Sequence, residues 1–422
     1  MKKDLSPVDT SQGNPPSASD ADVASQWRRV VRRRAFLKVG AGVAAAAIPV
    51  GGLLATDAMA AGSSLTKGDA AILRFLAAAE IIETDLWQQY NELGGVNGGN
   101  AAYMAALQNL DGDMPQYIAD NTDDEMSHAA FLNAYLKSRG AQPVNLDKFR
   151  TLPSSKATGA RQIGRLTNLQ TLDVDTSWYT RYRSEQNPDF GAQFPQAVNI
   201  RNEPAIPLND TDTPPTQAQP VPPATAQQQR MQAIANTAGF HFAYIEQGGA
   251  SLYTALSLKA SDVEVLRVIV SIGGVEVDHF AVWHDKAGNA VSQPLAGVTD
   301  PETGVNFPDL NARNSETFQT NLIFPEPAQF IRKGLPVCSV IRPSSIEVGG
   351  AVATIKSFTA DLLFKGQSQE FFDTVMDLGA GGRRRSARAV ADLATGLPVR
   401  HRAPRRFPGR RRRLSPSSQS IS

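Results

Sequence analysis

The chain has 422 residues, of which 41% are hydrophobic and 20% are charged, so it is long enough to bury one or two sizeable cores. The formal net charge is only +1, but both ends are basic and the middle is more acidic. The single cysteine, Cys338, excludes an intrachain disulfide and any metal site built from several cysteines. A metal site in this chain would therefore use carboxylate and imidazole ligands.

Residues 1–60 predict a polar, disordered leader followed by an export signal. Arg33-Arg34 precedes an apolar run from Val39 to Leu54 and the small-residue sequence Ala58-Met59-Ala60. This order resembles the bacterial twin-arginine signal, although Arg32 stands where Ser or Thr is usual. We expect cleavage before Ala61, export by the twin-arginine translocase and a periplasmic or extracellular location. An uncleaved membrane anchor is the alternative.

Helical periodicity predicts four long helices between residues 61 and 288. A Gly-rich segment ends the first helix, and Ser261-Asp262 begins the last. A shorter helix is expected near 101–110. We therefore predict an all-α fold with a four-helix bundle. Its helices cover about 69–93, 123–138, 226–258 and 263–285.

A proline-rich insertion at 144–225 separates the second helix from the third. Part of it, about 159–173, has a pattern that could be helical. A bundle made of two helical hairpins needs one long connection that crosses the length of the bundle. The longest connection of this chain falls at that position. Loops of this length are typically functional or disordered.

The C-terminal part divides into an extension and a tail. The extension, 289–380, is expected to be irregular up to Gly350 and to form one added helix over about 351–378. The tail, 381–422, has twelve arginines between Arg383 and Arg413, and we predict that it does not fold. A basic tail can bind nucleic acid or an anionic surface. We favour an out-of-frame translation of GC-rich DNA as the origin of this composition, and expect no nucleic-acid binding.

Two Glu-x-x-His motifs lie about 150 residues apart. They run from Glu125 to His128 and from Glu276 to His279, each inside a predicted helix. Residues three positions apart are neighbours on one helix face. Each Glu and His can therefore bind the same metal ion.

Each motif follows a helix with a glutamate and an aromatic residue seven positions later. These pairs are Glu80 with Trp87 and Glu246 with Tyr253, and two helical turns place both members of a pair on one face. We interpret the two halves as an internal pseudo-twofold repeat around one site. Glu83 lies on the same stripe as Glu80. It is a further ligand, a hydrogen-bonding neighbour of the ligands, or the true ligand of its helix.

Four glutamates and two histidines in this order predict a carboxylate-bridged dimetal site in the bundle. Buried carboxylates repel each other and raise one another's pKa, whereas two divalent cations balance four of them. The motif glutamates would bridge the ions, and each histidine would bind one ion. Oxygen-rich ligands with two histidines suit two iron ions, with two manganese ions as the alternative. The predicted ligands are Glu80, Glu125, His128, Glu246, Glu276 and His279, with Glu83 and Tyr253 as possible additional ligands or neighbours.

Other polar residues near these motifs receive weaker assignments. Asp124 and Asp278 could hydrogen-bond the motif histidines, or could be solvated. His241 and His284 point to other faces and are expected in the core or on the surface. Tyr253 is expected in the core, where it could also carry an electron.

The segments 72–87, 123–136, 242–256 and 274–283 resemble the ferritin-like superfamily, within it the exported bacterial proteins related to desiccation-associated proteins. This resemblance implies the four-helix bundle and a dimetal site. It leaves the reaction open, because the superfamily includes iron-storing ferritins, rubrerythrin-like peroxidases, manganese catalases and carboxylate-bridged oxidases. The long insertion and extension differ from a cage-forming ferritin, and the cysteine pairs of a rubredoxin-like domain are absent.

We therefore expect metal ions and oxygen or peroxide as partners, and redox chemistry in protection against oxidative or desiccation stress. One alternative is a dimanganese, catalase-like enzyme. The other is a non-enzymatic metal-binding or structural stress protein of the cell envelope.

Overall fold

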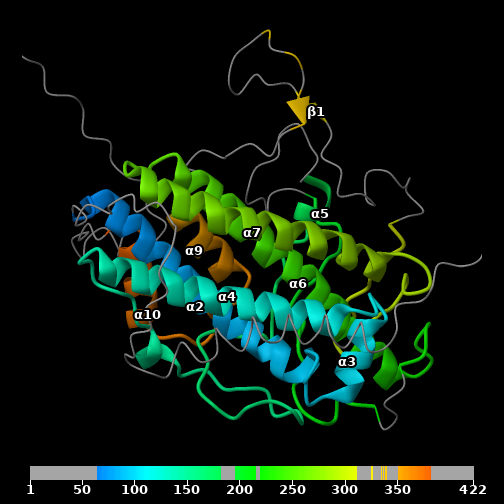
Figure 1. Cartoon of the computed structure of the whole chain (residues 1–422). Helices are drawn as coiled ribbons and strands as arrows, with labels where there is room; N and C mark the ends of the chain where they lie inside the picture. The colour runs from blue at the N-terminus through cyan, green and yellow to red at the C-terminus, as the bar shows by residue number, and fades with distance from the viewer. Residues whose placement is uncertain are drawn as a thin grey trace, which may run out of the picture. The chain divides into compact units, whose positions relative to one another are not determined.

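A computed structural model of the chain describes most of residues 64–381, and its regular secondary structure is almost entirely helical (Figure 1). The sheet in the described part is a pair of antiparallel two-residue strands, β1 (Pro325–Glu326) and β2 (Cys338–Ser339). The predicted all-α fold class is confirmed. The predicted export signal and arginine-rich tail lie outside the described residues. The described residues are 64–181, 195–214, 219–310, 325–326, 334, 336, 338–339 and 350–381.

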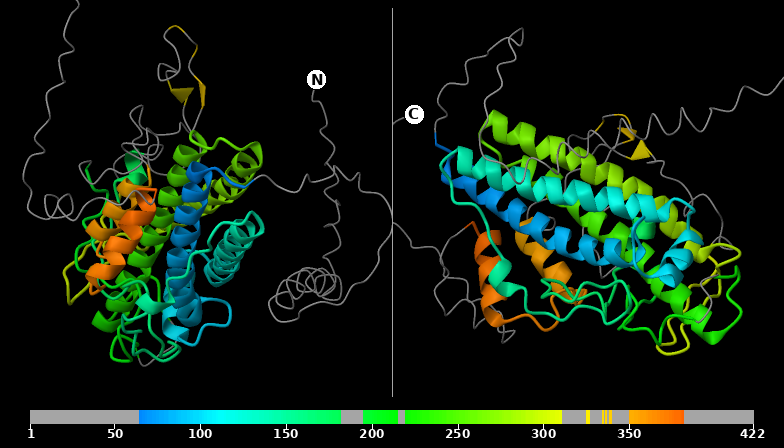
Figure 2. Two further views of the ribbon diagram at one scale, coloured as in Figure 1. Left: turned by 90° about the vertical axis from the view of Figure 1, so that its left-hand side faces the viewer. Right: turned by 60° about the horizontal axis from the view of Figure 1, so that its bottom comes forward.

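Four long helices form two hairpins. Helix α2 pairs with α4, α6 pairs with α7, and α2 also contacts α6 (Figure 2). The short helix α3 (Ala101–Gln108) lies between α2 and α4 and packs on α6. The predicted four-helix bundle is present, and α2, α6 and α7 begin and end close to the predicted positions. The four helices are α2 (Lys67–Gly94), α4 (Met114–Ser138), α6 (Ala226–Ser257) and α7 (Val263–Ala287).

Local side-chain caps fix where these helices start. Thr66 caps α2, Thr225 begins α6 with a capping box, and Asp262 caps α7. Asp69, in the first turn of α2, accepts hydrogen bonds from the backbone N–H and the hydroxyl of Ser261, at 2.8 and 2.6 Å. The start of α2 is therefore tied to the turn between α6 and α7.

Helix α4 begins at Met114, nine residues before the predicted start at 123. Pro115 lies in its first turn, where backbone N–H groups have no acceptor within the helix, so the N–H that proline lacks costs no helical hydrogen bond. The added turns are mostly polar, which hides the helical periodicity. Their buried face carries Ile118, Asn121 and Thr122, so polar residues occupy positions where an apolar stripe would be expected.

The connection between α4 and α6 contains two short helices in its described part, η1 (Asp147–Phe149) and α5 (Trp178–Arg181). Residues 159–173, which could have been helical, form no helix. Instead, isolated bridges join Leu152 to Arg165 and Leu172 to Glu203. Backbone hydrogen bonds of this stretch therefore go to other segments of the chain.

Asp85 on α2 holds this connection against the bundle. Its buried carboxylate accepts hydrogen bonds from the backbone N–H groups of Leu166 and Thr167, both at 2.9 Å. It also forms an ion pair with Arg150 at 2.6 Å. A buried carboxylate is costly unless its oxygens are hydrogen-bonded, and here they are. The described part of the connection is thus packed against the bundle.

The C-terminal helical region differs from the single predicted helix. It forms α9 (Ala351–Ala360), which packs on α6, and α10 (Gln369–Gly379), which packs on α2. Between them, Leu362 and Gly366 have φ values of +64° and +93°, which a continuous helix does not allow. Ser368 then caps α10. The prediction of one helix was wrong because the apolar spacing continues across this break.

The segment after α7 starts with η2 (Gly288–Val291) and is otherwise irregular up to residue 310, as predicted. A bridge between Thr299 and Asn306 closes a turn. Phe307 and Leu310 are buried against the core. None of the described helices combines the length and the apolar composition that crossing a membrane requires.

We expect Asp85→Asn to lower the free energy of unfolding by about 2–3 kcal/mol, because it removes a charged acceptor shared by several donors. Urea unfolding followed by circular dichroism measures the change. Asp123→Asn, at an exposed position of α4, is the matched control and should have little effect. Equal stabilities of the two variants would contradict the role given to Asp85.

Candidate metal centre

The two Glu-x-x-His motifs meet the glutamates of α2 and α6 between the four long helices. Each of the four helices contributes one face to the cluster, so the helical spacing seen in the sequence becomes a common interior site. Their side chains are all buried, and the most exposed of them is 9% exposed. The cluster consists of Glu80 from α2, Glu125 and His128 from α4, Glu246 from α6, and Glu276 and His279 from α7.

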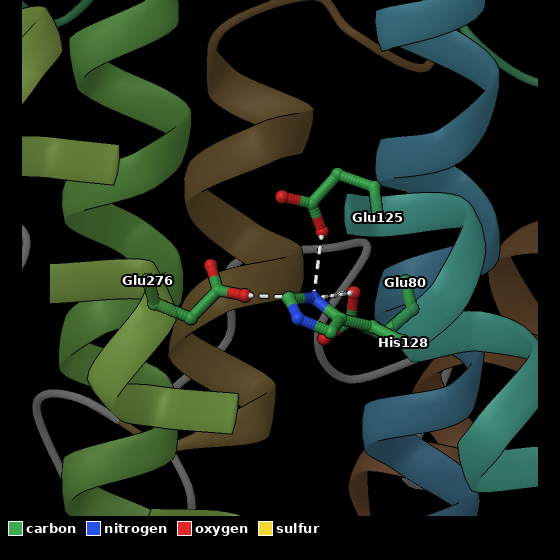
Figure 3. A group of neighbouring side chains, drawn as sticks. All are labelled: Glu80, Glu125, His128 and Glu276. Atoms are coloured by element: carbon green, nitrogen blue, oxygen red, sulfur yellow. Dashed lines mark hydrogen bonds and ion pairs between the residues drawn. The ribbon is translucent and has the colours of Figure 1, made fainter. Parts of the chain in front are cut away.

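One half of the cluster surrounds His128 (Figure 3). Its Nδ1 atom lies 3.4 Å from Oε2 of Glu80 and 3.3 Å from Oε2 of Glu125. The same nitrogen lies 3.4 Å from Oε1 of Glu276. One ligand atom from each of these four residues lies within 4.8 Å of the others. Three carboxylates and one imidazole could therefore hold a single cation.

The other half surrounds His279 in a related way. Nδ1 of His279 lies 3.1 Å from Oε1 of Glu125 and 3.2 Å from Oε2 of Glu246. Glu276 completes this second group of four. Glu125 and Glu276 belong to both groups, and Glu125 directs a different oxygen to each histidine. Two neighbouring cation positions that share two carboxylates are thus compatible with the geometry.

The donor atoms fit a pair of divalent cations. Three buried carboxylate oxygens, both of Glu276 and Oε2 of Glu80, have no hydrogen-bond partner among the described residues. Two of them, Oε1 of Glu276 and Oε2 of Glu80, reach only Nδ1 of His128 as an ion-pair partner, at 3.4 Å. A buried carboxylate oxygen that lacks a partner costs free energy, which a bound cation would recover. Carboxylate oxygens with imidazole nitrogens suit iron and manganese.

The carboxylates of the cluster titrate differently from free glutamates. Burial, reinforced by the charge of Glu125, raises the pKa of Glu80 to about 8. Burial and the same neighbour raise the pKa of Glu276 well above its usual range. Burial also acts to raise the pKa of Glu125, but hydrogen bonds with His128 and His279 outweigh it, so the pKa of Glu125 falls below its usual value.

The two histidines hold protons more tightly than free imidazole does. Burial lowers their pKa values, but the surrounding carboxylates outweigh burial and raise the pKa of both His128 and His279 above the usual value. The cluster therefore attracts positive charge strongly. A metal ion bound here would displace these protons, since imidazole and carboxylate ligands must be deprotonated.

Residues around the cluster orient its ligands. Oδ2 of Asp124 lies 3.2 Å from Nε2 of His279, which leaves Nδ1 directed at the carboxylates. Asp278, the other candidate partner, is exposed. The buried hydroxyl of Tyr253 donates a hydrogen bond to Oε1 of Glu80. Tyr253 therefore contacts a predicted ligand.

Sequence reasoning missed Asn121. Its side-chain amide donates to Oε1 of Glu125 at 2.9 Å and to Oε1 of Glu246 at 3.0 Å. Asn121 stands four residues before Glu125, so helical spacing could have revealed it. It was overlooked because this part of α4 was expected to be outside the helix.

Glu83 is buried on α2 but does not belong to either group of four. Burial and the charge of Glu276 raise its pKa well above the usual range. Its counterpart in the other half of the repeat is Gly249. A Cβ atom added there would lie 2.2 Å from Oε2 of Glu276, so Gly249 makes room for that carboxylate.

The two remaining described histidines lie away from the cluster, in the core. His241 is fully buried, with its Nδ1 atom 2.7 Å from the hydroxyl of Tyr90. His284 is also buried, and its ring stacks on Tyr179. The expectation that they occupy other helix faces agrees with these positions.

We expect the affinity of the cluster for divalent metal to rise as the pH increases through about 8, where Glu80 loses its proton. The sign follows from competition: raised pKa values mean that protons occupy the ligands below this pH, and metal must displace them. Titration with a competing chelator at several pH values gives the affinity. An affinity that does not change with pH would contradict the ligand assignment.

We expect Gly249→Ala to lower metal binding, because the added methyl group displaces the carboxylate of Glu276. Helix propensity alone predicts that the same substitution stabilises the fold, by up to about 1 kcal/mol. Gly274→Ala on α7 is the matched control, since a Cβ atom there meets nothing within 4 Å. Metal content and thermal unfolding distinguish the two variants. Equal metal contents would show that Gly249 is not needed for space.

The cluster lies inside a recognised domain. The family model described as "Ferritin-like domain" matches residues 68–289, which is just over half of the chain. The match runs from the first turn of α2 to the residues that follow α7, and so includes all six clustered residues. No curated protein and no solved structure matches the chain. The chain belongs to the ferritin-like domain family.

Proposed function

We propose that this protein binds two iron ions at the cluster and uses them for redox chemistry with oxygen or peroxide. The observation that supports this proposal most directly is the pair of four-residue donor groups that share Glu125 and Glu276. Shared carboxylates allow two cations to lie close together, and a close pair of redox metals can exchange two electrons with one small oxidant.

The chain supplies the ligands and controls their protons. The two histidines and four glutamates of the cluster would hold the ions, which when bound would supply redox equivalents and a binding place for oxygen or peroxide. Asn121 orients Glu125 and Glu246 by donating to both. Burial raises the pKa of Tyr253 well above its usual value, so the phenol keeps its proton and remains a donor to Glu80.

The cellular setting that we propose is the periplasm or the extracellular space, with a role in oxidative or desiccation stress. The support is the twin-arginine-like sequence before residue 61 and the resemblance to exported desiccation-related proteins. Export of a folded protein would allow metal to be loaded in the cytoplasm, before the protein meets competing metals outside.

A dimanganese centre is the second candidate, because the same oxygen-rich donors with two imidazoles also suit manganese. The two candidates predict different behaviour with peroxide. A dimanganese, catalase-like protein releases oxygen from peroxide without an external electron donor, whereas the proposed di-iron protein consumes peroxide as an oxidant.

The decisive experiment is elemental mass spectrometry of the mature protein beside the Glu125→Gln/Glu276→Gln variant. We expect about two iron ions per chain in the native protein and a large loss of iron in the variant, because both shared ligands are weakened. Glutamine keeps the size of the side chain, so the fold should persist, as circular dichroism can check. Glu370→Gln, at an exposed position, is the control.

Each result has a distinct meaning. Two manganese ions in place of iron would favour the catalase-like candidate. A correctly folded protein that binds neither metal would overturn the proposed function and leave a ferritin-like bundle that serves as a structural module.

A further inference from the structure

A series of aromatic and imidazole rings leads away from the metal cluster. Trp283 stacks on Trp87 with 5.3 Å between ring centroids, and Trp87 contacts Tyr90 at 5.8 Å. Tyr90 contacts His241 at 6.0 Å, and His241 contacts Tyr244 at 6.2 Å. All five side chains are 2% exposed or less. We call these five residues the ring series.

The ring series is joined to the cluster by Asn121. The indole N–H of Trp283 donates to Oδ1 of Asn121 at 2.7 Å. The amide nitrogen of Asn121 donates in turn to Glu125 and Glu246. One polar side chain therefore connects the first indole of the series to two of the predicted metal ligands.

The far end of the series borders a cavity. Tyr244 lines a cavity of about 300 Å³ between α9, α6 and the α4–α6 connection, and its hydroxyl lies 2.5 Å from Oγ of Ser357. Arg201 and Lys356, which also line the cavity, are exposed, so the cavity reaches the surface. A continuous set of contacts thus runs from the buried cluster to a solvent-accessible cavity.

The lining of this cavity suits a small hydroxyaromatic molecule. Val174 and Ala353 provide apolar walls, and Asp361 provides a buried carboxyl group that can accept a hydrogen bond from a hydroxyl. Burial raises the pKa of Asp361 well above its usual range, which favours the protonated carboxyl group. The volume is at the lower end of the range for small-molecule sites and is sufficient for a single aromatic ring.

The middle of the series is arranged for a proton to move with an electron. A tyrosine that loses an electron must also lose its hydroxyl proton, and Nδ1 of His241 lies 2.7 Å from the Tyr90 oxygen. Burial lowers the pKa of His241 to about 3, so this imidazole is neutral and can accept that proton. With its own proton on Nε2, the ring faces Oδ2 of Asp361 at 3.4 Å.

We propose that the ring series carries single electrons from a hydroquinone-type reductant in the cavity to the metal pair. This inference rests on the proposed function, because it requires a redox-active metal at the cluster. Ordinary core packing would explain buried rings, but it does not explain a series that begins at a ligand-bonding amide and ends at an open cavity. The other buried tryptophan of the described residues, Trp178, packs beside Tyr179 and outside this series.

Each transfer balances as a one-electron step. The hydroquinone loses one electron and releases one proton to water at the cavity. The electron refills the vacancy on Tyr244, then crosses the His241 ring, which contacts both tyrosines, to fill that on Tyr90, and later transfers fill those on Trp87 and Trp283. The Tyr244 proton passes through the hydroxyl of Ser357 to water in the cavity and returns, and the Tyr90 proton moves to Nδ1 of His241 and returns, so no net proton travels along the series. At the cluster, a bound ferric ion would be the one-electron acceptor, and two such events would supply one electron to each ion.

The test compares Trp87→Phe, Tyr90→Phe and the control Trp178→Phe in the full, iron-loaded protein. Phenylalanine preserves a ring but is much harder to oxidise. We expect the first two variants to be reduced by hydroquinone about tenfold more slowly or worse in stopped-flow absorbance, since a modest rise in the barrier acts exponentially on the rate. Trp178→Phe should match the native rate. Rapid-freeze electron paramagnetic resonance after peroxide treatment should show an aromatic radical that Tyr90→Phe alters.

Metal content and thermal unfolding of each variant are measured first. Native iron content with equal reduction rates in all variants, and an unchanged radical signal, would overturn the relay while leaving the proposed function intact. Absence of iron from the native protein would overturn both, and elemental analysis alone would show it. Slower reduction confined to the two series variants, at native iron content, would establish the relay.

Discussion

The electrostatic problem created by burying four carboxylates in one bundle determines much of this structure. Each carboxylate is desolvated, and each raises the pKa of others, as the values for Glu80 and Glu276 show. Two histidines, an asparagine amide and a tyrosine hydroxyl partly compensate these charges, because each is directed at oxygens of the four carboxylates. These groups compensate only part of the charge, and divalent cations would compensate the rest. The remainder of the fold holds these groups in place.

The two halves of the pseudo-twofold repeat have matching predicted ligands but differ in the residues that surround those ligands. Asn121 on α4 corresponds to Ile272 on α7, and Glu83 on α2 corresponds to Gly249 on α6. The two cation positions are therefore chemically different, although their nearest donors are alike. At one position, Glu80 accepts a hydrogen bond from the hydroxyl of Tyr253. At the other, Glu246 accepts one from the amide of Asn121, which itself accepts a hydrogen bond from the indole of Trp283. Such differences would give the two ions different affinities and potentials.

Sequence periodicity predicted the elements whose buried faces are apolar. Helices α6 and α7 have continuous apolar stripes and clear caps, and their limits were predicted closely. The start of α4 was missed because buried polar residues such as Asn121 replace the stripe. Residues 159–173 looked helical because Leu166, Leu169 and Leu172 are spaced by three. Their backbone groups instead form hydrogen bonds with Asp85 and with neighbouring segments of the chain. Helical spacing was sufficient to predict that the six candidate ligands lie together. The roles of Gly249 and Asn121 could not be predicted in this way, because they depend on contacts between different helices.

The way in which the hairpins share donors has a consequence for assembly. The position at His128 draws three donors from the α2–α4 hairpin and one, Glu276, from the other hairpin. The position at His279 draws three from the α6–α7 hairpin and one, Glu125, from the first. Neither hairpin alone has a complete set, and the long α4–α6 connection must close before either set exists. A metal pair bound there would act as a removable cross-link between chain segments distant in sequence, so that occupancy would report whether the two halves have docked.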